Sequence, residues 1–171
     1  GVSESIIPNY TVDRLAAELG IFRKWVLQEL IGVATPFFDD IIDFLVHACN
    51  AQPKVTIHRD FHCRNLLIKL DGSLGAVDFQ DALVGPISYD LASILYDCYH
   101  QFSDKTVATA ITRYLQLARE AGVYSDDKDE GFTRALEITA VQRQLKAVGI
   151  FSRLKLQQGR ASHLKNIVPV M

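Results

Sequence analysis

Two short stretches of this chain decide its fold: His58-Arg59-Asp60-Phe61-His62-Cys63-Arg64-Asn65 and Val77-Asp78-Phe79-Gln80. They follow the patterns H-R-D-x-x-x-x-N and D-F-x, which are typical of phosphoryl transfer. That chemistry needs one carboxylate beside the attacking hydroxyl, and a second carboxylate and an amide to hold magnesium on the nucleotide phosphates. We therefore predict Asp60 as the catalytic base, and Asn65 and Asp78 as the side chains that bind Mg²⁺ and, through it, ATP.

The segment between the two stretches is predicted to be a β-hairpin. An apolar run over residues 65–70 ends at Asp71-Gly72, a dipeptide that favours tight turns because Gly tolerates a positive φ. A second short strand over residues 74–77 then leads to Asp78. Since a hairpin folds back on itself, Asn65 and Asp78 should lie close together at its open end. Oxygen ligands placed there suit a hard cation such as Mg²⁺.

The segment before the first stretch is predicted to be helical. Thr11 can cap a helix that begins at Val12, with Gly20 as a candidate break. A second helix is expected to start at Thr35-Pro36, because Pro is tolerated in the first turn. The residues expected to face the core are Leu15, Leu19, Phe22, Val26 and Leu30 in the first helix and Phe38, Ile41, Ile42, Leu45, Ala48 and Cys49 in the second. A short strand over residues 54–57 then leads into the first stretch.

The segment after the second stretch is also predicted to be helical. A buried helix is marked by Leu91, Ile94, Leu95 and Cys98. Ser103 can cap the next helix, and Gly122 lies just past its end. Ser125-Asp126-Asp127 precedes a long helix that is expected to reach Leu156. Helices therefore outnumber strands, and the predicted fold class is mainly α with a small β-hairpin.

These motifs resemble the aminoglycoside phosphotransferase and choline kinase-like family, whose fold is that of the protein kinases. A third segment, Gly85–Ala92, adds to the resemblance. In that family a similar segment opens a buried helix whose Asp binds the backbone of the catalytic loop, and Asp90 is the matching position. The stretches HRDFHCRN, DFQDA and GPISYDLAS are most similar to bacterial sugar or aminosugar kinases, which phosphorylate the anomeric hydroxyl of N-acetylated hexosamines. Arg59 departs from the commoner H-G-D pattern of the aminoglycoside enzymes, and Gln80 stands where protein kinases have Gly.

The resemblance also indicates a missing part. A kinase of this fold clamps ATP with a Gly-rich loop and a strand Lys, both supplied by its first lobe. The ten glycines of this chain are scattered, and residues 1–52 have a helical pattern instead. We predict that residues 1–171 form a single domain, the C-terminal lobe of a kinase-like α+β fold, without the N-terminal lobe that clamps ATP.

Other polar residues near the predicted site receive supporting roles. His58 is expected to orient the loop rather than transfer protons. Arg64 and Asp81 are expected either to contact a substrate hydroxyl or phosphate or to form surface ion pairs. Arg143 follows Gln142 on a helix that borders the acceptor pocket in such folds, but it lies off the apolar stripe, so we predict a solvated charge. The aromatic residues are mostly expected to pack in the core: Trp25, Phe37, Phe38, Tyr89, Tyr96 and Tyr99.

Composition narrows the range of functions. A formal net charge of −2 argues against a nucleic-acid binder that relies on bulk electrostatics. No apolar run approaches the roughly 20 residues needed to cross a bilayer, so no membrane contact is expected. The N-terminus lacks the pattern of a signal peptide. The three cysteines, Cys49, Cys63 and Cys98, have no paired spacing, which favours free thiols in the cytoplasm. Cys63 is expected to be a loop thiol without a catalytic role.

Three functions are compatible with these patterns. The first is the catalytic and acceptor-binding lobe of an ATP-dependent small-molecule kinase, with a sugar or aminosugar as acceptor. The second is a catalytically incompetent interaction module of the same fold, which self-associates through the face left by the missing lobe. The third takes His58, Asp60 and His62 as alternate residues on a strand that bind the metal of a hydrolase. This third function leaves Asn65 and Asp78 unexplained.

Overall fold

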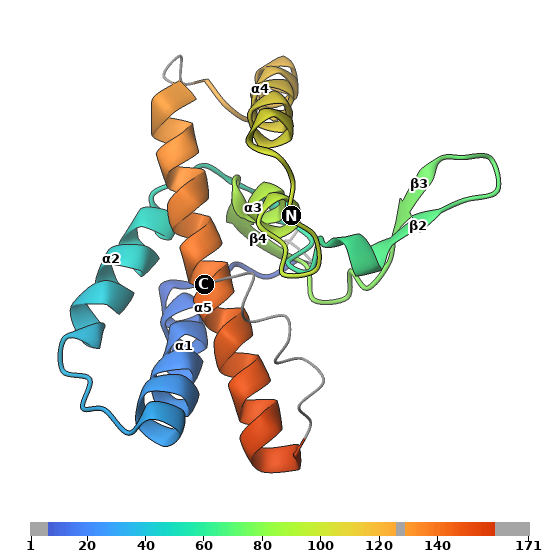
Figure 1. Cartoon of the computed structure of the whole chain (residues 1–171). Helices are drawn as coiled ribbons and strands as arrows, with labels where there is room; N and C mark the ends of the chain where they lie inside the picture. Colours follow the sequence, from blue (N-terminus) through green and yellow to red (C-terminus); the bar gives the residue numbers. More distant parts are fainter. Residues whose placement is uncertain (1–6, 126–128, 160–171) are drawn as a thin grey trace, which may run out of the picture.

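Helices dominate the computed structural model, which describes residues 7–125 and 129–159 (Figure 1). In chain order the elements are α1 (Val12–Phe22), the π-helix η1 (Arg23–Ile31), α2 (Phe38–Asn50), β1 (Lys54–Ile57), the 3₁₀ turn η2 (Cys63–Asn65), β2 (Leu66–Ile68), β3 (Leu74–Ala76), β4 (Leu83–Pro86), α3 (Tyr89–Leu95), α4 (Asp104–Glu120) and α5 (Asp129–Gln158). The predicted fold class, mainly α with small antiparallel strand pairs, is confirmed. Within the described residues no helix is both long and apolar enough to cross a membrane.

The long helix α5 runs through the middle of the helical body and packs against α1, η1, α2 and α3 (Figure 1). Its approach to α1 depends on Gly149. A Cβ atom at that position would lie 2.7 Å from the backbone N of Phe22 and 2.8 Å from its Cα. Because those are backbone atoms that cannot move aside easily, only glycine allows the two helices to come this close.

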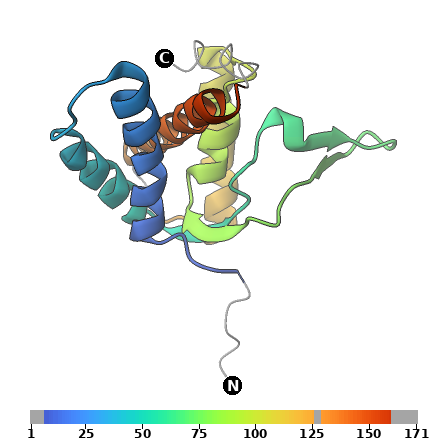
Figure 2. The same cartoon turned by 90° about the horizontal axis from the view of Figure 1, so that it is seen from below.

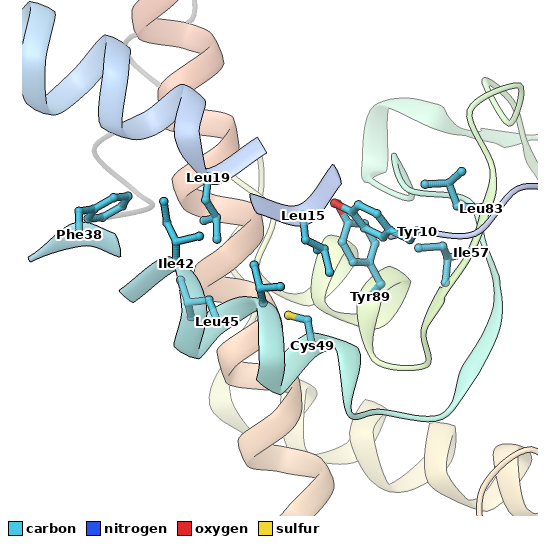
Figure 3. Packing of buried hydrophobic residues seen from close by; sticks show 11 residues of the cluster. Tyr10, Leu15, Leu19, Phe38, Ile42, Leu45, Cys49, Ile57, Leu83 and Tyr89 are labelled. Atoms are coloured by element: carbon cyan, nitrogen blue, oxygen red, sulfur yellow. The ribbon is translucent and has the colours of Figure 1, made fainter. Parts of the chain in front are cut away.

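The buried apolar residues form two clusters. The first joins α1, α2, β1 and the start of α3 (Figure 3), and consists of Tyr10, Leu15, Leu19, Phe38, Ile42, Leu45, Val46, Cys49, Ile57, Leu83 and Tyr89. The second joins α3, α4 and α5, and consists of Ile87, Leu91, Ala92, Leu95, Leu115, Ala118, Tyr124, Phe132, Leu136 and Ala140. The predicted catalytic loop begins directly after β1, whose last residue, Ile57, belongs to the first cluster.

The first helix differs from its prediction in two ways. Thr11 caps it as expected, since its Oγ1 accepts a hydrogen bond from the Arg14 N–H at 3.3 Å. Gly20 does not break it; the helix instead widens into a π-helix at Arg23. A π-helix bonds i to i+5, so the spacing of an α-helical stripe no longer applies. Leu30 consequently turns outward and is 51% exposed, contrary to the prediction.

The second helix begins later than predicted, at Phe38 rather than at Thr35-Pro36. The Thr35 carbonyl accepts a hydrogen bond from the Phe38 N–H, which forms a separate turn ahead of the helix. Ile41 is exposed and Ala48 is only half-buried, so the prediction that these two residues lie in the core is wrong. The other four predicted core residues are buried: Phe38, Ile42, Leu45 and Cys49.

The later helices follow the prediction closely, apart from the length of α3. Ser103 caps α4, and Gly122 adopts a φ of 68° just past its end. Helix α5 ends at Gln158, and the predicted start at Asp126-Asp127 lies outside the described residues. Helix α3 ends at Leu95, so Cys98 is not part of it. The Asp97 side chain accepts the Tyr99 N–H at 3.1 Å, which builds a turn in place of another helical turn.

Two separate antiparallel strand pairs flank the predicted catalytic loop. Strand β1 has the predicted bounds and pairs with β4, which the sequence pattern did not reveal. Strands β2 and β3 form the predicted hairpin, with Gly72 in its turn at a φ of 79°. The hairpin projects away from the helices (Figures 1 and 2).

Candidate active site

The predicted catalytic loop begins directly after β1 and is held by Asp90 in the first turn of α3. Its Oδ2 accepts a hydrogen bond from the His58 N–H at 2.6 Å, and its Oδ1 accepts one from the Arg59 N–H at 3.0 Å. Burial raises the pKa of Asp90 above its ordinary value, although these bonds and the nearby charge of Arg143 act in the opposite direction. The contact between Asp90 and the loop backbone is the one that the family resemblance implied.

Arg59 adopts an unusual backbone conformation immediately before Asp60. Its φ is 74°, in the left-handed region that few residues other than glycine occupy. The commoner H-G-D pattern places glycine at this position, where a positive φ costs little. Arg59 is 7% exposed, and its side chain reaches Glu18 in α1. The departure from the family pattern therefore coincides with a buried charge pair.

The backbone carbonyl of Asp60 accepts two hydrogen bonds from later residues of the loop. The donors are the His62 N–H at 3.0 Å and Asn65 Nδ2 at 2.9 Å. The Asn65 carbonyl in turn accepts the Val77 N–H at 3.0 Å, which joins the start of the hairpin to its end. These bonds place Asn65 and Asp78 at one end of the hairpin, as predicted.

The side chains of Asn65 and Asp78 lie in contact. Asn65 Nδ2 is 3.5 Å from Asp78 Oδ2, and Gln80 Nε2 donates to Asp78 Oδ1 at 2.8 Å. Because Nδ2 of Asn65 is directed at the Asp60 carbonyl, its Oδ1 is left to act as a ligand. An amide oxygen and an exposed carboxylate fit a hard cation that keeps water and phosphate oxygens as its other ligands.

A cavity of about 170 Å³ opens beside Asp60, between the catalytic loop, the segment after α3, and α5. Asp97 connects two of these walls, because its Oδ2 accepts the Cys63 N–H at 3.2 Å while its Oδ1 binds the turn at Tyr99. The Arg64 guanidinium stacks on the Tyr99 ring, 3.9 Å from its centroid. The lining residues are Asp60, His62, Ser93, Tyr96, Asp97, Cys98, Tyr99, Arg143, Gln144, Lys146, Ala147, Ile150 and Phe151.

The prediction for Arg143 is wrong. Its Nη1 donates to the Arg59 carbonyl at 2.7 Å, and its guanidinium lies 4.6 Å from the centroid of the Tyr89 ring. The prediction assumed one apolar stripe on α5, whereas α5 is covered by several helices on different sides. For the same reason Gln142, its neighbour on α5, is completely buried.

Geometry does not favour the metal-hydrolase alternative. Strand β1 ends at Ile57, so His58, Asp60 and His62 do not alternate along a strand. The His58 ring instead packs against Phe61, with 5.8 Å between centroids. Across residues 7–125 and 129–159, His, Cys, Asp and Glu side chains form no group of three or more that could hold a metal ion.

The cysteines near the cavity remain thiols at neutral pH. Burial raises the pKa of Cys98 to about 11, and Asp97 adds to the effect. Burial and Asp97 also raise the pKa of Cys63. Cys63 therefore lacks the lowered pKa of a reactive cysteine, in agreement with its predicted non-catalytic role.

Glu18 and Lys146 are two charged residues that the motifs did not reveal. Lys146, which lines the cavity, has its Nζ 3.2 Å from Glu18 Oε2. Burial alone would raise the pKa of Glu18, but the charges of Lys146 and Arg59 and the hydrogen bond from Tyr10 outweigh it and hold the pKa below its ordinary value. A signal was present, because Glu18 occupies the same helix face as Leu15 and Leu19, where a charge needs a partner.

The chain was compared with protein families and with curated proteins. The described elements, mainly helices with two small antiparallel strand pairs, are those of a kinase-like α+β fragment. Residues 7–125 match the model of the phosphotransferase enzyme family, and the chain belongs to that family.

Proteins called N-acetylmuramate/N-acetylglucosamine kinase are similar to nearly the whole chain. The one from Neisseria meningitidis serogroup B is 37% identical over 169 residues, which cover 96% of this chain and 50% of the relative. Those from Pseudomonas aeruginosa and Pseudomonas putida are 35% and 31% identical, over 95% and 94% of this chain and 49% of each relative. The chain thus spans about half the length of these curated relatives.

Proposed function

We propose that this chain is the catalytic and acceptor-binding lobe of an ATP-dependent phosphotransferase that phosphorylates a hydroxyl of a sugar or aminosugar. The observation that carries the proposal is the contact of Asn65 with both the Asp60 carbonyl and the Asp78 carboxylate. Family membership and the names of the relatives support it. By analogy with those names, the preferred acceptor is the anomeric hydroxyl of an N-acetylated hexosamine.

Each of the three predicted site residues has one task in this proposal. Asp60 lines the cavity, where its carboxylate can accept the proton of the acceptor hydroxyl and align the hydroxyl oxygen for attack. Asn65 and Asp78 would hold Mg²⁺ through one oxygen each. Bound with ATP, the ion would neutralise phosphate charge that develops during transfer. Positioning and charge neutralisation therefore supply the catalysis, as this type of reaction requires.

The cavity offers the surfaces that a sugar needs. Arg143 and Lys146 on α5 face a wall that contains Asp60 and Asp97, so donors and acceptors of hydrogen bonds lie on both sides. Rings from Tyr96, Tyr99 and Phe151 add apolar surface for the C–H face of a sugar ring. This mixture of charges favours a polyhydroxylated acceptor over a strongly cationic one.

We further propose that the rest of a longer protein supplies the lobe that clamps ATP and covers the β2–β3 hairpin. A two-stranded hairpin that stands alone is marginally stable in water. This one is largely apolar, and more than half of the residue surface is exposed at Leu67, Ile68, Leu70 and Leu74, as it is at Phe79 just past the hairpin. In this arrangement residues 1–171 are a single C-terminal lobe.

The same exposed hairpin favours a second candidate function. Without a covering lobe the chain would be a catalytically incompetent module that self-associates through the hairpin. It would then bind Mg-ATP weakly, because two ligands alone make a weak cation site. We expect a cytoplasmic location in either case, since Cys49, Cys63 and Cys98 are all free thiols.

The direct test is phosphate transfer from Mg-ATP by the natural protein that carries this chain. The acceptors are N-acetylglucosamine, N-acetylmuramate and glucose, and the product is followed with labelled phosphate. Asp60→Asn should lower kcat by about 10²- to 10⁴-fold, the range for loss of a general base. Asp71→Asn, which changes an exposed carboxylate at the tip of the hairpin, is the matched control and should be active. Undiminished turnover by Asp60→Asn would show that the base is assigned wrongly.

A further inference from the structure

Glu18 is a buried carboxylate that belongs to none of the sequence motifs. It is 8% exposed, yet it lies in α1 among the apolar residues of the first core cluster. Charged partners from two other elements surround it: Arg59 Nη2 donates to Oε1 at 2.7 Å, and Lys146 Nζ lies 3.2 Å from Oε2. The Tyr10 hydroxyl also donates to Oε2. A carboxylate is retained in such a place only when it is paired this completely.

The partner that matters for the site is Arg59, because this residue is held by four contacts, two on its left-handed backbone and two on its side chain. The backbone N–H is held by Asp90, and the carbonyl is held by Arg143. On the side chain, Nη1 donates to the Asp81 carbonyl at 3.3 Å, and Nη2 donates to Glu18. Of these contacts, only the one with Glu18 joins two opposite charges, so it is the strongest restraint on the side chain.

The backbone that follows Arg59 connects it to the predicted site residues. Asp60 is the next residue, and its carbonyl receives the side-chain amide of Asn65, which touches Asp78. A continuous series of contacts therefore runs from Glu18 through Arg59 to all three predicted site residues. On its other side Glu18 holds Lys146, which lines the cavity.

We infer that Glu18 is a positioning residue, which fixes the catalytic loop through Arg59 and one wall of the acceptor cavity through Lys146. Its effect on turnover rests on the proposed function, whereas its effect on the loop does not. Glu18 itself does not line the cavity, so it would act only through the residues that it holds.

The first experiment needs no activity and uses the chain labelled with ¹⁵N. In Glu18→Gln, the amide resonance of His62 and the side-chain amide resonances of Asn65 should shift, because both groups donate to the Asp60 carbonyl. The matched control is Asp39→Asn, which removes the carboxylate of the exposed ion pair between Arg23 and Asp39. It should leave those resonances in place. Unshifted resonances in Glu18→Gln would overturn the inference.

Two further variants keep the result decisive if Glu18→Gln folds poorly. Glu18→Asp keeps the charge on a shorter side chain and should give smaller shifts in the same direction. Arg59→Gly keeps a residue that accepts a φ of 74° but removes the guanidinium. In the Arg59→Gly background, changing Glu18→Asp should no longer move the Asn65 resonances. An equal shift with and without Arg59 would show that the coupling does not run through this residue.

The second experiment measures phosphate transfer by the natural protein that carries the chain. Glu18→Gln should lower kcat about 10- to 100-fold, the size expected when a reacting group is displaced by about 1 Å. The KM for ATP should be unchanged, and Glu18→Asp should recover part of kcat. A wild-type kcat in Glu18→Gln would overturn the inference. If the wild-type protein itself transfers no phosphate, the proposed function fails, and the resonances still decide the role of Glu18.

Discussion

Arg59 combines a left-handed backbone with a buried positive charge, and the two features depend on each other. Glycine would adopt the conformation more easily but would make no contact with α1. Arginine makes that contact, and the charge pair with Glu18 offsets part of the conformational cost. The replacement of glycine by arginine in this motif therefore changes what the loop is attached to, while the backbone path stays compatible with both residues.

The pairing of Glu18 predicts how stability depends on pH. Because its pKa is lowered in the folded state, Glu18 stabilises the fold above its unfolded-state pKa of about 4.3. This contribution is lost as the pH falls through the lower folded-state pKa. The free energies of unfolding of the wild type and Glu18→Gln, measured in urea from pH 7 to pH 3, should therefore converge toward acid pH. A constant difference between them over that range would contradict the prediction.

At the scale of elements, the contact between α1 and α5 is limited by one glycine. Gly149→Ala would place a Cβ against the backbone of Phe22, so we expect a loss of about 1–3 kcal/mol in the free energy of unfolding. Gly20→Ala is the matched control, because nothing lies within 4 Å of its added Cβ. In the interior of α1 it should stabilise the protein by about 0.5–1 kcal/mol. Urea unfolding of both variants tests this contrast, and equal effects would contradict it.

The parts of the site that sequence predicted are those built by local geometry. Asn65 and Asp78 meet because a short hairpin with Gly72 in its turn joins them, and a turn signal is visible within a few residues. Strand β4 was missed because it pairs with β1, which lies far away in sequence, and because it ends in proline. The role of Arg143 was missed because it depends on the tertiary contacts of α5 with the loop.

On the scale of the whole molecule, the hairpin is a projecting part with exposed apolar residues. Its cross-strand partners Ile68 and Leu74 are both exposed. We expect the isolated chain to self-associate, and the double variant Ile68→Lys/Leu74→Glu to be monomeric while its opposite charges keep the strands paired. Sedimentation velocity over a range of concentrations tests this. Leu117→Lys, at an exposed position on α4, is the control and should associate like the wild type.

A monomeric wild type at every concentration would contradict this prediction. In the longer protein that we propose carries this chain, the same double variant tests a different contact. If a further lobe covers the hairpin there, the same double variant should weaken ATP binding while leaving the oligomeric state unchanged. Measuring the double variant in both the isolated chain and the longer protein therefore shows what binds the hairpin: a second copy of the chain, or another part of the same molecule.

The small β1–β4 ladder has a consequence for how insertions would be tolerated. It pairs Ile57 with Leu83, and this register aligns the His58 N–H, the first amide of the loop, with the carboxylate of Asp90. Slipping this ladder by one residue would move Asp90 about 3.3 Å along the strand direction, beyond reach of those amides. The register of these two four-residue strands therefore fixes the position of Asp90 relative to the predicted catalytic loop. An added residue in β4 should abolish phosphate transfer even if the helices fold normally.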